Sequence, residues 1–226
     1  MYKFFKRFFD ILLSGIAILL LSPLLVSVMI ILKCTGEHDI FYGQDRVGYR
    51  NKHFKILKFA TMLRNSPNMA GGCVTAKNDP RILPMGGFLR KTKINELPQL
   101  LNIFLGDMSF VGPRPQTRSH FELYTPAVRD AISSVRPGLS GMGSLVFRDE
   151  ETLLEGVDDR MRWHHEVFAP YKGELELWYS RHQNLFVYFA IIFMTMWSVL
   201  RPSTRIYRRV FKDLPPVPEA LKGMLG

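Results

Sequence analysis

The pattern of apolar residues opens with a segment long enough to reach through a bilayer. Residues 11–32 contain no charged side chain, and as a helix they would extend roughly 33 Å at about 1.5 Å per residue. Lys3, Lys6 and Arg7 precede this segment and Lys33 follows it, so the positive-inside rule gives no direction of crossing. A cleaved signal peptide fits poorly, because the stretch is too long and no small-residue cleavage site follows it.

Ser22-Pro23 interrupts this segment at its midpoint. Proline removes one backbone donor and its ring presses on the carbonyl of Leu19, so the helix should kink there. The hydroxyls of Ser14, Ser22 and Ser27 could donate to carbonyls that the kink frees. Basic residues at both ends and a break in the middle favour a re-entrant hairpin that enters and leaves by one face of the membrane. A kinked single span is the alternative.

Short strands and one helix are predicted for the central part of the chain. Two segments, residues 40–42 and 53–59, flank a turn at residues 48–51 and predict a β-hairpin. Residues 64–80 are rich in Asn, Pro, Gly and Asp and predict a loop. The helix that follows ends at Gly106 and has one apolar face, formed by residues at helical spacing: Leu97, Leu100, Leu101, Phe104 and Leu105.

A second apolar segment covers residues 185–200. As a helix it would be about 24 Å long, short for the hydrocarbon core, and basic residues flank it. We therefore expect it at the membrane surface or against the first helix, with a buried core helix as the alternative. Closely spaced prolines near the end predict an extended arm. The predicted domains are a membrane anchor (1–36), a main domain (37–212, membrane-associated from about 174 to 200) and a C-terminal tail (213–226).

The net charge narrows the choice of partners. The 226 residues carry a formal charge of +10, which attracts anionic lipid headgroups, phosphorylated substrates or nucleic acid. Nucleic acid is disfavoured, because the chain shows no helix-turn-helix or zinc pattern and opens with a long apolar segment. Cys34 and Cys73 form no CxxC pair, which indicates reduced thiols and no structural zinc.

Basic residues gather around the start of the predicted central helix. Asn95 is placed as its N-cap and Glu96 in its first turn, where free backbone N–H groups favour a phosphate. Arg90 and Lys93 immediately precede this position. We interpret the four residues as parts of a phosphate site, although a simple cap and surface ion pairs would explain each one separately.

Two arginines lie in stiff loops further along the chain. Arg114 stands in Gly112-Pro113-Arg114-Pro115, and Arg136 opens Arg136-Pro137-Gly138. Prolines beside a guanidinium restrict its backbone, which suits bidentate contact with phosphate oxygens. Both arginines are therefore candidate substrate phosphate ligands.

Two longer stretches carry a resemblance. Residues 91–100, KTKINELPQL, and 106–115, GDMSFVGPRP, resemble the signature of the bacterial sugar transferases, the monotopic phosphoglycosyl transferases. Shorter matches at residues 6–10, 22–23, 45–48, 79–81 and 136–138 follow in the same order. The resemblance extends over about residues 5–200, and a motif of this length is specific.

The resemblance implies an α+β, monotopic membrane protein at the cytoplasmic face of the bacterial inner membrane, with a re-entrant helix broken at Ser22-Pro23, interfacial amphipathic helices and a small β-hairpin. It implies Mg²⁺ and transfer of a phosphosugar from a nucleotide diphosphate sugar to polyprenyl (undecaprenyl) phosphate, in exopolysaccharide, capsule or O-antigen (lipopolysaccharide) assembly. Anionic membrane lipids and a homo-oligomer are further expected partners. In the family, an Asp of an Asp-Glu pair attacks the sugar-linked phosphate and forms a covalent intermediate.

This chain departs from the family at that pair, which reads Asn95-Glu96. Asparagine cannot form an acyl phosphate, but its amide oxygen can ligate Mg²⁺ more weakly than a carboxylate. Glu96 and Asn95 are therefore candidates for catalysis and for metal binding. Glu176, where relatives commonly carry Asp, is the third candidate metal ligand.

A second departure follows at residues 143–151. Asp149 and Glu150 could supply a replacement catalytic carboxylate, or they could form the acidic first turn of a helix. Arg148 beside them is a further candidate phosphate ligand. Four interpretations stay open: an engineered Asn95, one-step phosphosugar transfer, transfer of the sugar alone to a lipid-linked acceptor with release of nucleoside diphosphate, and a catalytically silent membrane scaffold.

Overall fold

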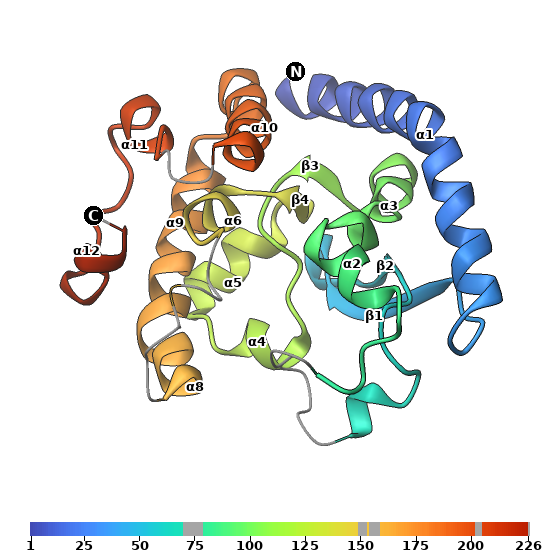
Figure 1. The fold of residues 1–226 in the computed structure, drawn as a ribbon. Coiled ribbons are helices and arrows are strands. Elements are labelled where there is room, and N and C mark those ends of the chain that lie inside the picture. Colours follow the sequence, from blue (N-terminus) through green and yellow to red (C-terminus); the bar gives the residue numbers. More distant parts are fainter. Residues whose placement is uncertain (70–78, 149–152, 154–158, 202–204, 226) are drawn as a thin grey trace. The chain divides into compact units, whose positions relative to one another are not determined.

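The computed structural model describes residues 1–69, 79–148, 153, 159–201 and 205–225 (Figure 1). These residues form two compact units, each described by itself. Unit 1 comprises Met1–Asp10, Arg46–Phe54 and Gly106–Gly226, and unit 2 comprises Ile11–Asp45 and Lys55–Leu105. The first helix and the β-hairpin therefore contribute residues to both units.

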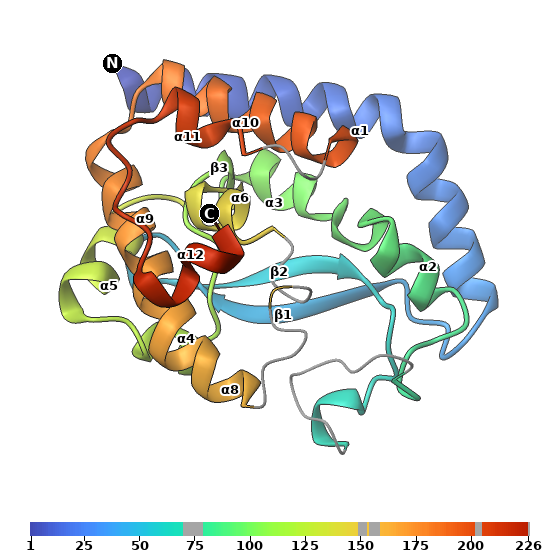
Figure 2. The ribbon, with the colours of Figure 1, turned by 60° about the vertical axis from the view of Figure 1, so that its left-hand side comes forward.

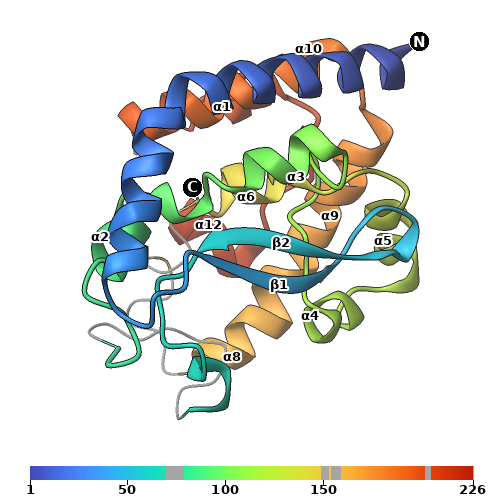
Figure 3. The ribbon, with the colours of Figure 1, turned by 90° about the vertical axis from the view of Figure 1, so that its right-hand side faces the viewer.

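Helix α1 (Tyr2–Cys34) contains Pro23 and bends part way along its length (Figure 3). Pro23 has no N–H to give to the carbonyl of Leu19, and the Ser22 hydroxyl donates to that oxygen instead, at 2.8 Å. The predicted repair of the kink by Ser22 is thus confirmed, while Ser27 donates to the carbonyl of Pro23. Among the described residues, α1 is the helix long and apolar enough to cross a membrane.

The predicted β-hairpin is present. Strand β1 (Phe41–Val47) pairs with β2 (His53–Phe59), and the turn between them contains the short 3₁₀ helix η1 (Tyr49–Asn51). Arg50 and Asn51 have φ values of 56° and 59°, so the left-handed backbone of two successive residues reverses the chain.

The single helix that the sequence predicts before Gly106 is divided into three short helices in unit 2. These are α2 (Gly86–Lys91), the 3₁₀ helix η3 (Ile94–Glu96) and α3 (Gln99–Leu105), and another 3₁₀ helix, η2 (Ser66–Asn68), lies in the preceding loop. Gly106 ends α3 with φ of 103°. Helix α2 packs on the part of α1 that follows Pro23, through a small apolar core of Val28, Leu32, Leu89 and, from β2, Phe59.

Unit 1 is built around two short parallel strands. In this sheet β3 (Ser109–Val111) pairs with β4 (Gly138–Ser140), with Ser109 opposite Gly138 and Val111 opposite Ser140. Its described helices are α4 (Arg118–Glu122), α5 (Pro126–Ser133), α6 (Met142–Val146), α8 (Arg160–Trp163), the π-helix η4 (His164–Phe168), α9 (Ala169–Arg181), α10 (Leu185–Leu200), α11 (Tyr207–Val210) and α12 (Glu219–Leu225).

The second apolar segment forms α10, with the bounds that the sequence predicts. Asn184 caps it, because its side chain accepts a hydrogen bond from the Val187 N–H at 2.9 Å. Val187, Tyr188 and Ile191 are buried in the unit 1 core, whereas Phe186 and Phe193 are 67% and 59% exposed. The helix therefore keeps an outward apolar face, as expected for a membrane-associated segment.

The C-terminal tail is packed, so the prediction of an extended arm is wrong. Leu221 and Leu225, four residues apart on α12, are buried in the unit 1 core, and the tail runs along α9 (Figure 2). The Tyr171 hydroxyl donates to the carbonyl of Pro215 at 3.0 Å. The prolines set the path of the chain into α12, and the leucine pair supplies the burial that holds it.

Candidate active site

The Asn95-Glu96 pair lies in the tight turn η3, which changes the expected geometry. The residue before this turn, Lys93, is left-handed with φ of 60°, and no side chain caps the turn. The prediction of Asn95 as a helix N-cap is therefore wrong. The chain instead makes 3₁₀ hydrogen bonds, from Glu96 N to Lys93 O and from Leu97 N to Ile94 O, so these N–H groups are already used.

Two buried amide side chains in this region each have one polar atom without a hydrogen bond to the part of the chain that the structure describes. Asn95 is 8% exposed and Gln99, four residues later, is 2% exposed. Within the described residues, Asn95 Oδ1 and Gln99 Nε2 have no hydrogen-bond partner. An unsatisfied buried polar atom costs about 1–3 kcal/mol, so this recess is prepared for a polar ligand or for water.

Glu96 faces a cation that the sequence interpretation missed. Lys58 Nζ on β2 lies 3.5 Å from Glu96 Oε1, and the two side chains are 20% and 18% exposed. The sequence could have indicated Lys58 as a site residue, because alternation along β2 places it on the same face as the buried Ile56. A charged residue at an inward strand position is an exception to the usual alternation and should be treated as a site residue.

Asn102 fixes α3 against the strand that carries Lys58. Its Oδ1 accepts from the Leu57 N–H and its Nδ2 donates to the Lys55 carbonyl, both at 2.9 Å. The amide thus replaces a neighbouring strand for two backbone groups of β2. Asn102 is 3% exposed, so these hydrogen bonds are shielded from water and hold the helix after Glu96 in a fixed position.

An apolar cavity adjoins this polar recess within unit 2. It has a volume of about 200 Å³ and is lined by α1 residues on both sides of the Ser22-Pro23 break, by Phe41 and Phe59 of the hairpin, and by Leu97, Pro98, Leu100 and Leu101. Ser22 itself lines the cavity and Pro98 lies two residues after Glu96. A hydrocarbon chain is the kind of group that this lining accommodates.

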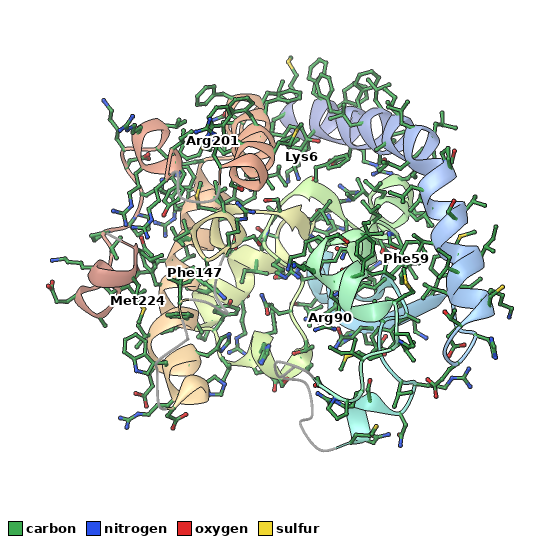
Figure 4. All side chains as sticks on the ribbon, in the orientation of Figure 1. Lys6, Phe59, Arg90, Phe147, Arg201 and Met224 are labelled. Atoms are coloured by element: carbon green, nitrogen blue, oxygen red, sulfur yellow. The ribbon has the colours of Figure 1, made fainter. Side chains whose placement is uncertain are left out.

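The two other predicted phosphate ligands of unit 2 differ in their surroundings. Arg90 (labelled in Figure 4) is half-buried at the end of α2, and its Nη1 contacts Met62 Sδ at 3.4 Å. Lys93 is exposed. Lys93 is therefore accessible to an anion in solution, whereas the side chain of Arg90 is partly covered and contacts Met62.

The loops that carry Arg114 and Arg136 contact each other backbone to backbone in unit 1. A Cβ atom at Gly112 would lie 2.2 Å from the Arg136 carbonyl oxygen, and one at Gly138 would lie 2.1 Å from the Gly112 nitrogen. Glycine is required at both positions, because no side chain fits. Arg114 is exposed, as a substrate ligand would be, and the Gly138 N–H donates to the Pro113 carbonyl at 2.8 Å.

Arg136 is directed toward the start of α1. Its Nε donates to the Gly106 carbonyl at 2.9 Å, and its guanidinium lies 5.5 Å from the centre of the Tyr49 ring. Both contacts belong to unit 1, where Arg136 and Tyr49 line a small cavity together with residues at the start of α1.

Glu176 on α9 is a buried carboxyl group with few polar neighbours. It is 5% exposed, and burial raises its pKa to about 7, although a hydrogen bond from the Gly143 N–H and the charge of Lys172 oppose this. Glu176 Oε2 and the nearby Ser144 Oγ have no hydrogen-bond partner in the described part of the chain. A carboxyl that is half protonated near neutral pH is a poor metal ligand by itself.

The remaining candidates are less defined. Arg148 is exposed, and Asp149 and Glu150 lie outside the described residues. Across the described ranges, no group of three or more His, Cys, Asp or Glu side chains could hold a metal ion. The candidates fall into two sets, with Asn95 and Glu96 in unit 2 and Arg114, Arg136 and Glu176 in unit 1.

Comparison with known proteins identifies the family of this chain. The sequence profile of the family described as bacterial sugar transferase matches residues 1–202. The exopolysaccharide production protein ExoY of Rhizobium meliloti is 37% identical over 166 residues, which cover 67% of this chain and 73% of that protein.

Two longer relatives match over most of this chain. UDP-glucose:undecaprenyl-phosphate glucose-1-phosphate transferase of Escherichia coli is 31% identical over 199 residues, 87% of this chain and 40% of that protein. Undecaprenyl-phosphate galactose phosphotransferase of Salmonella typhimurium is 33% identical over 213 residues, 88% of this chain and 41% of that protein. On the family profile and these identities, the chain belongs to the bacterial sugar transferase family.

Proposed function

We propose that this protein transfers a phosphosugar from a nucleotide diphosphate sugar to polyprenyl phosphate, in the assembly of a bacterial exopolysaccharide, capsule or O-antigen. Relatives named as undecaprenyl-phosphate sugar phosphotransferases support this reaction class. The observation that carries the proposal is the pairing of Lys58 with Glu96 beside an apolar cavity. A lipid phosphate requires a cation for its head and an apolar surface for its chain, and unit 2 offers both.

The cavity suits the carrier lipid. Its lining around Ser22 and Phe59 would hold the first isoprene units, and the phosphate would then reach Lys58 at the polar end. Transfer of this apolar surface out of water gains about 25 cal/mol per Å². The nucleotide sugar would bring its diphosphate to the exposed cation Lys93 of unit 2, which carries charge without a buried role in packing.

Mg²⁺ is part of the proposal, and the side chains of η3 fit it. Asn95 Oδ1 is a buried acceptor oxygen without a hydrogen bond among the described residues, and the Glu96 carboxylate is the next residue. Oxygen ligands of this kind suit Mg²⁺, which keeps several waters and binds through few protein groups plus phosphates. When bound, the ion would neutralise charge on the donor diphosphate.

Asn95 determines the order of bond changes. Because an amide cannot become an acyl phosphate, the carrier phosphate oxygen attacks the sugar-linked phosphorus directly. One new P–O bond forms to the carrier, the P–O bond to the nucleoside monophosphate breaks, and that monophosphate leaves. Glu96 removes the proton from a monoprotonated carrier phosphate, and Lys58 offsets the charge that develops between them.

The exposed apolar surface of the chain supports a membrane location. Only 11% of the most apolar window of α1 is buried, and the outward side chains of α10 are apolar too. We propose a re-entrant α1, bent at Pro23, with the body on the cytoplasmic face of the inner membrane. Basic residues at both ends of α1 favour a return to the same face.

One assay tests the transfer reaction and its alternatives. The purified protein, in vesicles with Mg²⁺, is given a panel of nucleotide sugars together with polyprenyl phosphate or a diphosphate-linked sugar acceptor. Nucleoside monophosphate as the product supports the proposal. Nucleoside diphosphate supports transfer of the sugar alone, a second candidate that is equally compatible with the Asn95 amide, since neither reaction needs an acyl phosphate. If neither product forms with any donor, the result supports the interpretation as a catalytically silent scaffold.

The variant Asn95→Asp sharpens the mechanism. It restores the Asp-Glu pair of the family, so a covalent phosphosugar adduct should accumulate when donor is supplied without acceptor. The wild-type protein should form no adduct under the same conditions. A wild-type adduct detected by mass spectrometry would contradict direct displacement and would point to a carboxylate elsewhere, with Asp149 and Glu150 as the first positions to test.

A further inference from the structure

The first turns of α1 carry two buried charged side chains. Lys6 and Asp10, one helical turn apart, are 8% and 1% exposed. Phe4 and Phe8 on the other face are 71% and 51% exposed. A helix on a water-soluble protein shows the opposite arrangement, so this segment presents its apolar face to a medium such as the outer part of a bilayer.

Asp10 is fully engaged in structure. Its Oδ1 accepts hydrogen bonds from Ser109 Oγ at 3.0 Å, from the Phe110 N–H at 3.0 Å and from the Tyr188 hydroxyl at 2.9 Å. All of these groups belong to unit 1. The carboxylate therefore fixes the start of α1 to β3 and α10, and its charge is spread over three donors.

Lys6 is less completely satisfied than Asp10. Lys6, which is labelled in Figure 4, is attracted to Asp10, and its Nζ lies 5.9 Å from the centre of the Tyr188 ring. A buried cation in this situation requires an anion or water in the space next to it.

That space is a cavity of about 40 Å³ within unit 1, which we name the α1 cavity. Its cations are Lys6, Arg7 and Arg136, with the exposed Lys3 at the rim, and Tyr49 and Ser134 complete the lining used here. Two carboxylates act on these groups, namely those of Asp10 and, close to Arg7, Asp107. Arg136 is close enough to repel both Lys6 and Arg7.

Four cations against two carboxylates leave an excess of positive charge around one small space. The excess is held in place by the packing of Lys6 and by the Arg136–Gly106 hydrogen bond. A bound phosphate would relieve the repulsion between Arg136 and Arg7, and it would accept a charge-assisted hydrogen bond from Lys6.

We propose that the α1 cavity binds the phosphate group of a membrane phospholipid. The lipid source is favoured because the same helical turns expose Phe4 and Phe8, which would place the cavity at the depth of the headgroups. Arg136 is then a lipid ligand and not a ligand of the sugar donor. The proposal rests on the membrane location of α1 and not on the transfer reaction, so its test requires no turnover.

Ser134 offers a matched pair of variants. It is exposed at the end of α5 and lines the α1 cavity, and its hydroxyl donates to the Ala131 carbonyl at 2.7 Å. Ser134→Glu places a carboxylate beside the cations, and Ser134→Gln adds nearly the same volume without charge. Any loss from the shared change in volume or hydrogen bonding is equal in both variants.

The protein is purified in dodecyl maltoside, which contains no phosphate, and is titrated calorimetrically with dihexanoyl phosphatidylglycerol below its micelle concentration. Wild type and Ser134→Gln should bind the lipid with the same Kd, and Ser134→Glu at least tenfold more weakly. Lys6→Arg should retain binding and Lys6→Gln should lose it. Parallel titrations with inorganic phosphate and with uridine monophosphate separate the lipid from soluble phosphates.

Equal lipid affinity of Ser134→Glu and Ser134→Gln would overturn the proposal, because charge in the cavity would then have no effect on binding. Binding of inorganic phosphate or uridine monophosphate that depends on Ser134→Glu, without lipid binding, would overturn the assignment to a lipid. Lipid binding that is sensitive to Ser134→Glu would stand even if the transfer assay gave no product.

Discussion

Lys58 Nζ and Glu96 Oε1 lie 3.5 Å apart, which joins strand β2 to the turn η3 through one ion pair. The pair is four-fifths buried, and Asn102 fixes the two elements against each other through hydrogen bonds to the backbone of β2. A carboxylate and an ammonium held in this way form a proton acceptor beside an anion site. This arrangement is what direct phosphoryl transfer needs on one side of the reacting phosphorus.

Replacement of Lys58 by methionine should lower both activity and stability. The pair is four-fifths buried, so removing its cation should cost roughly 3 kcal/mol of stability, and loss of the cation at a developing charge should reduce turnover of the folded protein by roughly a hundredfold or more. Turnover and thermal unfolding are measured on the same preparation. The control is Lys55→Met, an exposed lysine on the same strand; a similar loss of activity there would argue against a specific role for Lys58.

Asn102→Leu should destabilise unit 2 by about 2–4 kcal/mol. The substitution keeps the size of the side chain but leaves the Leu57 N–H and the Lys55 carbonyl without partners, at about 1–2 kcal/mol for each of these part-buried groups. Asn68→Ala in the exposed η2 loop should cost less than about 0.5 kcal/mol. Denaturant unfolding in detergent measures both variants, and equal effects would show that the two backbone groups find other partners.

Glu176 should make stability fall as pH rises. Its pKa in the folded protein is raised to about 7 from an ordinary value of 4.5, so the folded state holds a proton that the unfolded state has released. The loss begins above the unfolded pKa, grows through pH 7 and reaches about 3 kcal/mol. Glu176→Gln should therefore gain stability over wild type at pH 8 and lose this gain below pH 5. Parallel stability curves for the two proteins between pH 4.5 and 8 would contradict the assignment.

Two glycine substitutions should have opposite effects. Gly138→Ala would bring a methyl group to 2.1 Å from the Gly112 nitrogen, so it should cost more than about 3 kcal/mol and reduce the yield of folded protein. Gly223→Ala lies on α12, where a Cβ meets nothing within 4 Å, and should stabilise the protein by about 0.5–1 kcal/mol. Thermal unfolding and expression yield separate the two outcomes.

Local patterns predicted the elements whose cause is local. The Ser22-Pro23 kink follows from the chemistry of one proline, and α10 follows from an unbroken apolar run with Asn184 before it. The β-hairpin follows from two alternating segments around a turn. In each case the deciding interactions lie within a few residues along the chain, so the pattern contains them.

The features that the sequence interpretation missed depend on contacts between distant residues. Asparagine is a residue type that favours helix N-caps, so the sequence placed Asn95 there. In the structure the left-handed backbone of Lys93 turns the chain into η3 before α3 begins. Lys58 gains its importance from Glu96, which is 38 positions away in the numbering. The proline-rich tail is held by Leu221 against the unit 1 core. Helical spacing and composition do not encode such partners.

The hydrogen bonds of Asp10 have a practical consequence for how this protein can be handled. Its partners Ser109 and Tyr188 are 99 and 178 residues further along the chain. The start of α1 therefore joins β3 and α10 of unit 1 through the hydrogen bonds of one carboxylate. Deletion of residues 1–36, the usual way to obtain a water-soluble fragment, would remove the acceptor that both hydroxyls share. A truncated protein should misfold and aggregate, and biochemistry on this enzyme therefore requires the intact chain in lipid or detergent.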